Sequence, residues 1–167
     1  MLEEEMNLLC TILVLLTLLC GSASAEDVKK MNLDDAATLG TTIQTDLEVK
    51  TEGTGSIRIA TRFPTTICLG EIDNLNLEDT RLVYKAKVKS DLDGAAYLEM
   101  WAYVGPGRYF SKGMNDSVKG KSGWKTIRTP FIFRKGQNPE KVVLNLVING
   151  QGTVWIDDVV LSKEALQ

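Results

Sequence analysis

Apolar and polar residues alternate one by one in a series of short segments from about residue 42 onward. In RLVYKAKVK, residues 81–89, Leu82, Tyr84 and Val88 fall on one face while the lysines fall on the other. KVVLNLVIN, residues 141–149, repeats the pattern. A period of two is that of a β-strand with one buried face, and no sustained helical period follows residue 41. The sequence therefore predicts an all-β fold, an antiparallel β-sandwich or barrel, as a single domain.

Gly, Pro, Asn and Asp clusters such as DLDG, GPG, KGKSG and NGQG separate these segments and are typical of turns. They divide the domain into ten expected strands. These are Asp46–Thr51, Ser56–Thr61, Thr66–Leu69, Arg81–Ser90, Ala95–Val104, Arg108–Ser111, Trp124–Thr129, Phe131–Phe133, Lys141–Asn149 and Thr153–Ser162.

The N-terminal part has a different character. An apolar run followed by GSASA, with Ala23 and Ala25 in the spacing of a cleavage site, predicts a signal peptide over residues 1–25. The expected location is therefore secreted or periplasmic, without a membrane span after cleavage, and a lipoprotein anchored through Cys20 is the less favoured alternative. Residues 26–41 are polar and predict a flexible leader, with one weak helical turn at Leu33–Leu39, before a domain over residues 42–167.

Composition excludes several classes of chemistry. The chain has no histidine, which excludes Ser-His-Asp and Cys-His catalysis and zinc sites that need imidazole. After the signal, 19 basic residues face 19 acidic ones, because three of the 22 acidic residues lie in the first 25. This balance favours neither a nucleic acid nor an anionic membrane as partner. Cys68 is then the only cysteine, and it is expected to be a small buried side chain.

One strand breaks the simple pattern. In AAYLEMWAYV the face opposite the expected core carries Tyr97, Glu99, Trp101 and Tyr103 in one row. Aromatic rings stack on the C–H faces of sugars, and a nearby carboxylate or amide can hold the hydroxyl groups. The row therefore predicts a glycan-binding face. The alternative is that the rings pair across strands for stability alone, since aromatics have high β-propensity.

Lys87 and Asn145 are polar residues of two other expected strands. If those strands lie in the same sheet, both side chains are expected to join this face. Glu99 also raises the hypothesis of a small glycoside hydrolase. That chemistry uses two carboxyl groups about 5–10 Å apart, and Glu99 has no acidic partner two or four residues away. A partner from another strand is still open.

Adjacent carboxylates, Asp157 and Asp158, interrupt the last expected strand. Neighbours on a strand point to opposite faces, so the two carboxylates are not expected to act on one substrate atom. The pair is better interpreted as one metal-binding or loop-anchoring carboxylate and one polar neighbour than as a catalytic dyad.

Three stretches in this order point to a family: EGTGSIRIAT from residue 52, SGWKTIRTPF from residue 122, and KVVLNLVINGQGTVWIDDVVL from residue 141. Together they resemble the β-jelly-roll carbohydrate-binding modules of families 4, 16 and 22, within the galactose-binding-like fold. The likeness covers Thr45 to Lys163, and its most specific part is the closing hairpin. The chain also looks like single-domain secreted bacterial proteins of this type that have no assigned ligand.

The resemblance implies a structural calcium ion. Its ligand would be Asp157, with Asp158 in reserve and Glu48 and Glu52 as the nearest N-terminal carboxylates. Calcium takes six to eight oxygen ligands, so a few carboxylates and backbone carbonyls would suffice.

The sequence thus leaves three hypotheses in order. The first is a secreted, non-catalytic carbohydrate-binding domain that stacks a polysaccharide or other glycan on its aromatic face. The second is an envelope structural or interaction protein whose aromatic face docks another protein. The third is the small glycoside hydrolase.

Overall fold

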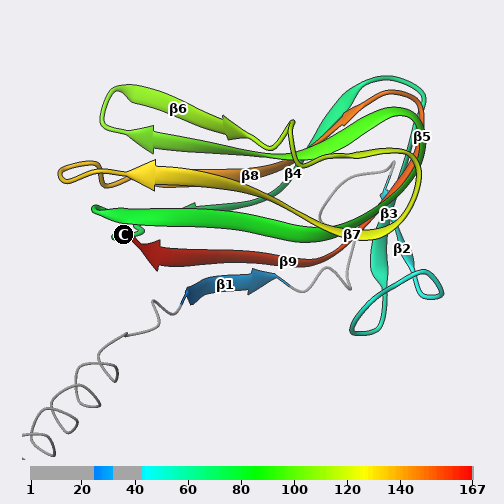
Figure 1. The fold of residues 1–167 in the computed structure, drawn as a ribbon, viewed down its shortest axis with the longest axis horizontal. Helices are drawn as coiled ribbons and strands as arrows, with labels where there is room; N and C mark the ends of the chain where they lie inside the picture. The colour runs from blue at the N-terminus through cyan, green and yellow to red at the C-terminus, as the bar shows by residue number, and fades with distance from the viewer. Residues whose placement is uncertain (1–24, 32–42, 167) are drawn as a thin grey trace, which may run out of the picture.

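The computed structural model describes residues 25–31 and 43–166, and within them the chain forms nine strands and no helix (Figure 1). The strands are β1 (Glu26–Met31), β2 (Ile43–Asp46), β3 (Ser56–Thr61), β4 (Thr65–Asp73), β5 (Thr80–Val104), β6 (Gly107–Lys112), β7 (Val118–Phe133), β8 (Lys141–Asn149) and β9 (Gly152–Ala165).

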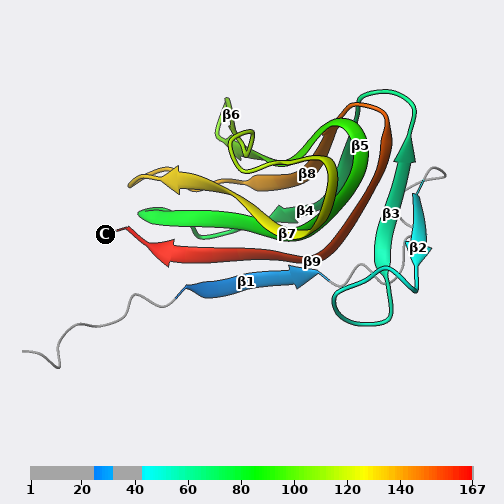
Figure 2. The same ribbon diagram turned by 45° about the vertical axis from the view of Figure 1, so that its right-hand side comes forward.

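All of the strand pairings are antiparallel, and β5 belongs to two layers. Its first half pairs with β7 on one side and β9 on the other, and β1 and β3 continue beyond β9. Its second half pairs with β6 and β8, and β4 continues beyond β8. Figures 1 and 2 show how the long strands curl at one end and fold the sheet into two layers. This is the expected β-sandwich of the jelly-roll type.

The crossing of β5 between the layers occurs at the stretch DLDG. The register with β7 shifts between Asp91 and Ala95, which is how a bulge bends a strand. Gly94 lies so close to the β8–β9 turn that a Cβ would stand 1.9 Å from the carbonyl oxygen of Asn149. Asp93 holds the bend against the β8–β9 turn through two hydrogen bonds. Its backbone N–H donates to the carbonyl oxygen of Gln151, and its side-chain Oδ1 accepts from the backbone N–H of Gln151. The residues that predicted a turn therefore form a bend within one continuous strand.

The core lies between the two layers, and the alternation predicted from the sequence places the side chains there. Leu98, Met100 and Ala102 of β5 are fully buried, as are Leu144 and Leu146 of β8. The opposite layer contributes the fully buried residues Leu82, Tyr84, Ala86, Val88, Ile127, Ile156 and Leu161. Burial of each large aliphatic side chain contributes about 1.5–3 kcal/mol, so this double row is the main source of stability.

Two segments differ from the expected strands. KGKSG is part of β7 instead of a turn, so that β7 runs unbroken from Val118 to Phe133 beside β5. Residues 47–51, expected in a strand, form a loop instead. Asp46 explains the loop, because its Oδ1 accepts hydrogen bonds from the backbone N–H groups of Glu48 and Val49 and turns the chain.

The leader also differs from its prediction. Residues 26–31 form β1, which pairs with β9 from Glu26 opposite Lys163 to Met31 opposite Val159. This part of the expected leader therefore forms a strand at the edge of β9. The expected signal peptide, Cys20 and the helical turn at Leu33–Leu39 lie outside the described residues. Among the described residues, we find no helix with the length and apolar character needed to cross a membrane.

Cys68 is exposed, and the expectation of a buried cysteine is wrong. Its strand, β4, lies at the edge of its sheet, and Cys68 stands opposite Asn145 on the outer face instead of the core face.

Candidate functional site

The row of aromatic residues on β5 lies on the outer surface of the β4–β8–β5–β6 layer. Residues directly opposite in an antiparallel pair point to the same side, so the register shows which neighbours share this surface. Glu99 stands between Asn145 and Lys112, Trp101 between Val143 and Phe110, and Tyr103 between Lys141 and Arg108. We call this surface the aromatic face. It comprises Tyr97, Glu99, Trp101, Tyr103, Arg108, Phe110, Lys112, Lys141, Val143 and Asn145.

Glu99 is the buried carboxylate of the aromatic face, 6% exposed. Its Oε1 accepts hydrogen bonds from Trp101 Nε1 at 2.7 Å and from Asn145 Nδ2 at 3.2 Å. Its Oε2 lies 3.1 Å from Lys112 Nζ. Burial by itself would raise the pKa of Glu99, but the hydrogen bonds from Trp101, Lys112 and Asn145 outweigh it and lower the pKa. Glu99 therefore stays ionised and acts as the acceptor that organises its neighbours.

Trp101 is fixed in place by two contacts. Its N–H donates to Glu99, and its ring lies 5.1 Å from the ring of Phe110, centroid to centroid, at a tilt of 49°. Lys112 reaches over Phe110, with Nζ 5.2 Å from the ring centre. A ring held in this way loses little freedom when a ligand stacks on it, which favours binding.

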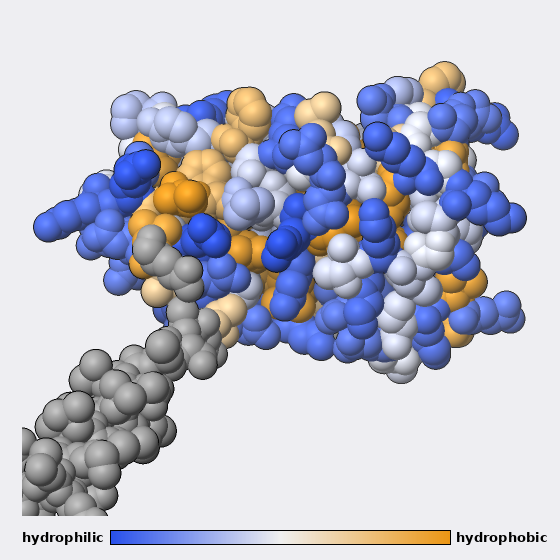
Figure 3. All heavy atoms as spheres, in the orientation of Figure 1, coloured by the Kyte–Doolittle hydropathy of each residue, from blue (hydrophilic) through white to orange (hydrophobic). Residues whose placement is uncertain are grey.

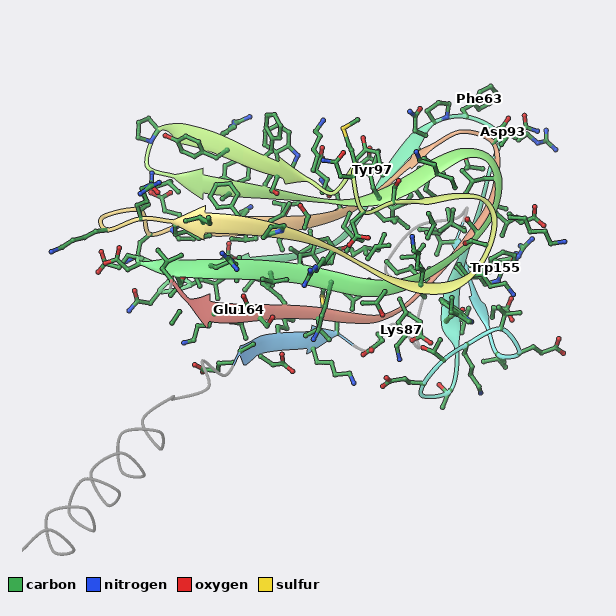
Figure 4. All side chains as sticks on the ribbon, viewed as in Figure 1. Phe63, Lys87, Asp93, Tyr97, Trp155 and Glu164 are labelled. Carbon is green, nitrogen blue, oxygen red and sulfur yellow. The ribbon has the colours of Figure 1, made fainter. Side chains whose placement is uncertain are left out.

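A hollow of about 250 Å³ opens on this face between β5, β6 and β8. Its lining consists of Trp101, Tyr103, Arg108, Val143 and Asn145. Three residues predicted from the sequence meet here, and Glu99 lies behind them through its bonds to Trp101 and Asn145. Tyr97 comes before Trp101 on β5 and does not line the hollow; Figure 4 shows it in the upper half of the molecule.

Sequence reasoning missed Arg108 and Val143. The signal for Arg108 was present in VGPGR, where Gly105 and Pro106 form a two-residue turn and set Val104 opposite Gly107. Gly105 has a φ of 52°, which glycine adopts without strain. The same register places Arg108 opposite Tyr103. Val143 gave no comparable signal, because only the pairing of β8 with β5 puts it beside Trp101.

Lys87 does not belong to the aromatic face. It comes from the first half of β5, in the other layer, and Figure 4 shows it at the lower edge, opposite Tyr97. Its Nζ lies 3.0 Å from Glu52 and 3.4 Å from Asp158. Lys30 of β1 makes the same two contacts, at 3.0 Å and 3.2 Å. We call this second group, Lys30, Glu52, Lys87, Asp157 and Asp158, the lysine cluster.

Asp157 is the anchor of the lysine cluster. It is 6% exposed, and its Oδ2 accepts hydrogen bonds from the backbone N–H and the hydroxyl of Thr51 and from the backbone N–H of Glu52. The N–H of Asp158 donates to its Oδ1. Asp157 thus fixes the loop between β2 and β3 to β9, which is the loop-anchoring role expected of one aspartate.

The expectation that Asp157 and Asp158 face opposite sides is wrong. β9 bulges here, because its register with β5 shifts between Lys85 and Lys87, and Asp158 has a φ of 49°. The bulge turns Asp158 to the side of Asp157, and both border one hollow with Lys30 and Glu52. Both carboxylates are nevertheless engaged by groups of the protein: Asp157 accepts hydrogen bonds from backbone N–H groups, and Asp158 pairs with two lysines.

The lysine cluster does not fit the calcium ion that the resemblance implies. Ammonium groups stand between the carboxylates of Glu52 and Asp158, where a metal ion would need to be, and three donors already occupy Asp157 Oδ2. Hydrogen bonds from Lys30 and Lys87 lower the pKa of Glu52 to about 2, and the same contacts raise the pKa of each lysine. Glu48 does not line the hollow. Within residues 25–31 and 43–166, no cluster of three or more acidic, cysteine or histidine side chains is arranged to hold a metal.

Comparison with known proteins gives a fold and no family membership. The sequence matches no model of a protein family and no curated protein. Among solved structures, the CBM22-1 xylan-binding domain from Paenibacillus barcinonensis Xyn10C has a TM-score of 0.57 at 10% identity, over 88% of this chain and 100% of that one. The CBM22-1–GH10 modules of Clostridium thermocellum xylanase 10B, complexed with xylohexaose, have a TM-score of 0.56 at 11% identity, over 87% and 29%.

A third structural neighbour has a different activity. A cyclase from Fischerella sp. TAU has a TM-score of 0.57 at 15% identity, over 70% of this chain and 66% of that one. The comparisons therefore confirm the β-jelly-roll fold of carbohydrate-binding modules. Because one fold carries several activities, the function must be argued from the aromatic face.

Proposed function

We propose that this protein binds a polysaccharide or another glycan on the aromatic face and does not cleave it. The observation that carries the proposal is the hollow beside Trp101, in which two aromatic rings, an amide and a guanidinium converge on one open surface. Aromatic rings beside a few oriented polar groups are the usual composition of a sugar site. The structural likeness to xylan-binding modules supports the same class of ligand.

The bonding of Glu99 argues against a hydrolase at this site. A glycosidase acid needs a raised pKa so that it holds a proton at neutral pH, whereas the pKa of Glu99 is lowered. Both of its oxygens are already engaged. Glu71, on β4 two strands away, is itself paired with Lys141 at 2.8 Å. Absence of turnover by the wild type on a panel of chromogenic glycosides is the result we expect.

A protein partner is the second candidate, and the exposed rings of β6 favour it. Tyr109 and Phe110 are 47% and 56% exposed. Figure 3 shows hydrophobic residues at the surface on the side of the molecule that it presents, among mostly hydrophilic ones. Large exposed apolar side chains are typical of interaction surfaces as well as of ligand sites.

A glycan array separates the two candidates. The wild-type protein should bind plant or microbial polysaccharides on the array, and Trp101→Ala should lose that binding while its melting temperature stays near that of the wild type. Failure of the wild type to bind any glycan would overturn the proposal and leave the protein partner as the better hypothesis.

A further inference from the structure

Arg108 is the cation at the rim of the hollow beside Trp101. Its guanidinium lies over the ring of Tyr103, 5.3 Å from the ring centre, and it lines the hollow with Trp101 and Asn145. Among the residues that the structure describes, no carboxylate forms an ion pair with it. The stack on Tyr103 holds the guanidinium at the mouth of the site without using its hydrogen-bond donors.

The other cations of the aromatic face differ from Arg108 in this respect. Lys112 is paired with Glu99 at 3.1 Å, and Lys141 is paired with Glu71 at 2.8 Å. The acidic side chains of this surface, Glu71 and Asp73, come from β4, and Asp73 stands directly opposite Lys141 of β8. The face therefore has a positive β6 side and a negative β4 side, with the hollow on the positive side.

From this arrangement we propose that the hollow selects an acidic glycan and receives a uronic acid residue. The sugar ring stacks on Trp101 and its carboxylate is bound by Arg108. A planar guanidinium matches a carboxylate with two parallel hydrogen bonds, which a neutral hydroxymethyl group cannot form. Asn145 donates to Glu99 through Nδ2, which fixes the amide and leaves its Oδ1 to accept from a ring hydroxyl. This inference rests on the proposed glycan-binding function and adds the class of sugar.

The test compares polysaccharides that differ only in the carboxyl group. Probes are glucuronoxylan, alginate and polygalacturonate, each next to its carboxyl-reduced form, with dextran sulfate as a purely anionic control polymer. Affinity electrophoresis gives the dissociation constants. We expect the wild type to bind at least one acidic polymer about tenfold more tightly than its reduced form, which corresponds to one charge-assisted contact.

Three variants locate the effect. Arg108→Gln should abolish the preference, and Arg108→Lys should keep only part of it because lysine lacks the planar fork. Lys125→Gln removes one exposed positive charge from β7, in the other layer, and should leave the preference unchanged. Arg108 is exposed at a hairpin, so both of its variants are expected to fold, and their melting curves verify this.

The outcomes separate this inference from the function on which it rests. Equal binding of acidic and reduced polymers, lost in Trp101→Ala, would overturn the acidic preference and support the glycan-binding site. Retention on dextran sulfate that matches the best acidic polymer would also overturn it, because charge alone would then explain the binding. Absence of binding to every polymer would overturn both.

Discussion

The aromatic face and the lysine cluster both place carboxylates and lysines on the outside of a sheet, yet they leave different groups open. In the lysine cluster, Asp157 bonds to the β2–β3 loop, while Glu52 and Asp158 each pair with the same two lysines. On the aromatic face, three side chains satisfy the carboxylate of Glu99, and two of them, Trp101 and Asn145, also line the hollow.

The two regions differ in what their polar contacts hold in place. The lysine cluster ties the loop between β2 and β3 to the sheet, because Glu52 of that loop bonds to Lys30 of β1 and to Asp157 of β9. The residues of the aromatic face come from strands that β-pairing already holds together. We therefore expect changes in the lysine cluster to affect stability and changes in the aromatic face to affect binding.

The largest effect should come from Asp157→Ala. The change leaves the backbone N–H groups of Thr51 and Glu52 without their acceptor, and bonds to a charged group contribute about 1.5–3 kcal/mol each. Because these donors regain some water, we expect a net loss of about 2–4 kcal/mol in the free energy of unfolding, measured by urea denaturation. Glycan binding by the folded variant should be unchanged. Loss of binding with normal stability would reverse our assignment of the two regions.

The second-largest effect should come from Trp101→Ala, which should lower the affinity for the glycan. A central tryptophan typically contributes about 2 kcal/mol or more to a recognition surface, which is roughly a thirtyfold loss of affinity. Calorimetric titration with the best glycan from the array measures it. Since Trp101 is only half-buried, the midpoint of unfolding should change much less than in Asp157→Ala. A large loss of stability would mean that the ring is mainly structural.

A smaller effect should come from Glu52→Gln, and it should depend on pH. Glu52 has a pKa of about 2 in the folded protein, below its ordinary value of 4.5. A lowered folded pKa gives stability that is fully present above 4.5 and is lost as the pH falls toward 2. Thermal melts of the variant should therefore show a shallower decline than the wild type between pH 4.5 and 2. Identical slopes would show that the lysine pairs are not formed in solution.

The smallest effect should be that of calcium. A ligand that binds only the folded state raises the melting temperature, and the lysine cluster leaves no place for a divalent ion. We expect melting temperatures in calcium chloride and in EGTA that agree within about 1 °C. The double variant Lys30→Ala/Lys87→Ala is the control for this measurement. It removes the two ammonium groups that pair with the carboxylates of Glu52 and Asp158. A rise of several degrees with calcium in the wild type would restore the metal site that the resemblance implies.

Alternation was enough to predict the two-layer β architecture and the core face of the longer strands. It also predicted that Glu99, Trp101 and Tyr103 share one outer face, because neighbours two apart on a strand always do. It could not tell which layer held each half of β5, and for that reason Lys87 was expected beside Trp101. The stretch DLDG has the composition of a turn, and only its contact with the β8–β9 turn makes it a bend.

Local irregularity explains the remaining errors. The bulge at Asp158 breaks the period of two, so strict alternation put the two aspartates on opposite faces. β1 has only a partly buried, mostly polar sequence, and its pairing with β9 depends on backbone bonds that no hydrophobic pattern records. Contacts between distant segments, such as Lys30 with Glu52, are not visible in a pattern that is read along the chain.

Glycan binding by the aromatic face is tested best by a calorimetric titration of three proteins with one oligosaccharide taken from the best polysaccharide. The proteins are the wild type, Trp101→Ala, and Trp124→Ala as the matched control, since Trp124 lies on β7 beside the first half of β5 and outside the aromatic face. We predict saturable binding of similar affinity by the wild type and Trp124→Ala, and binding that is about thirtyfold weaker with Trp101→Ala. Equal affinity of all three proteins would contradict the assignment of glycan binding to the aromatic face.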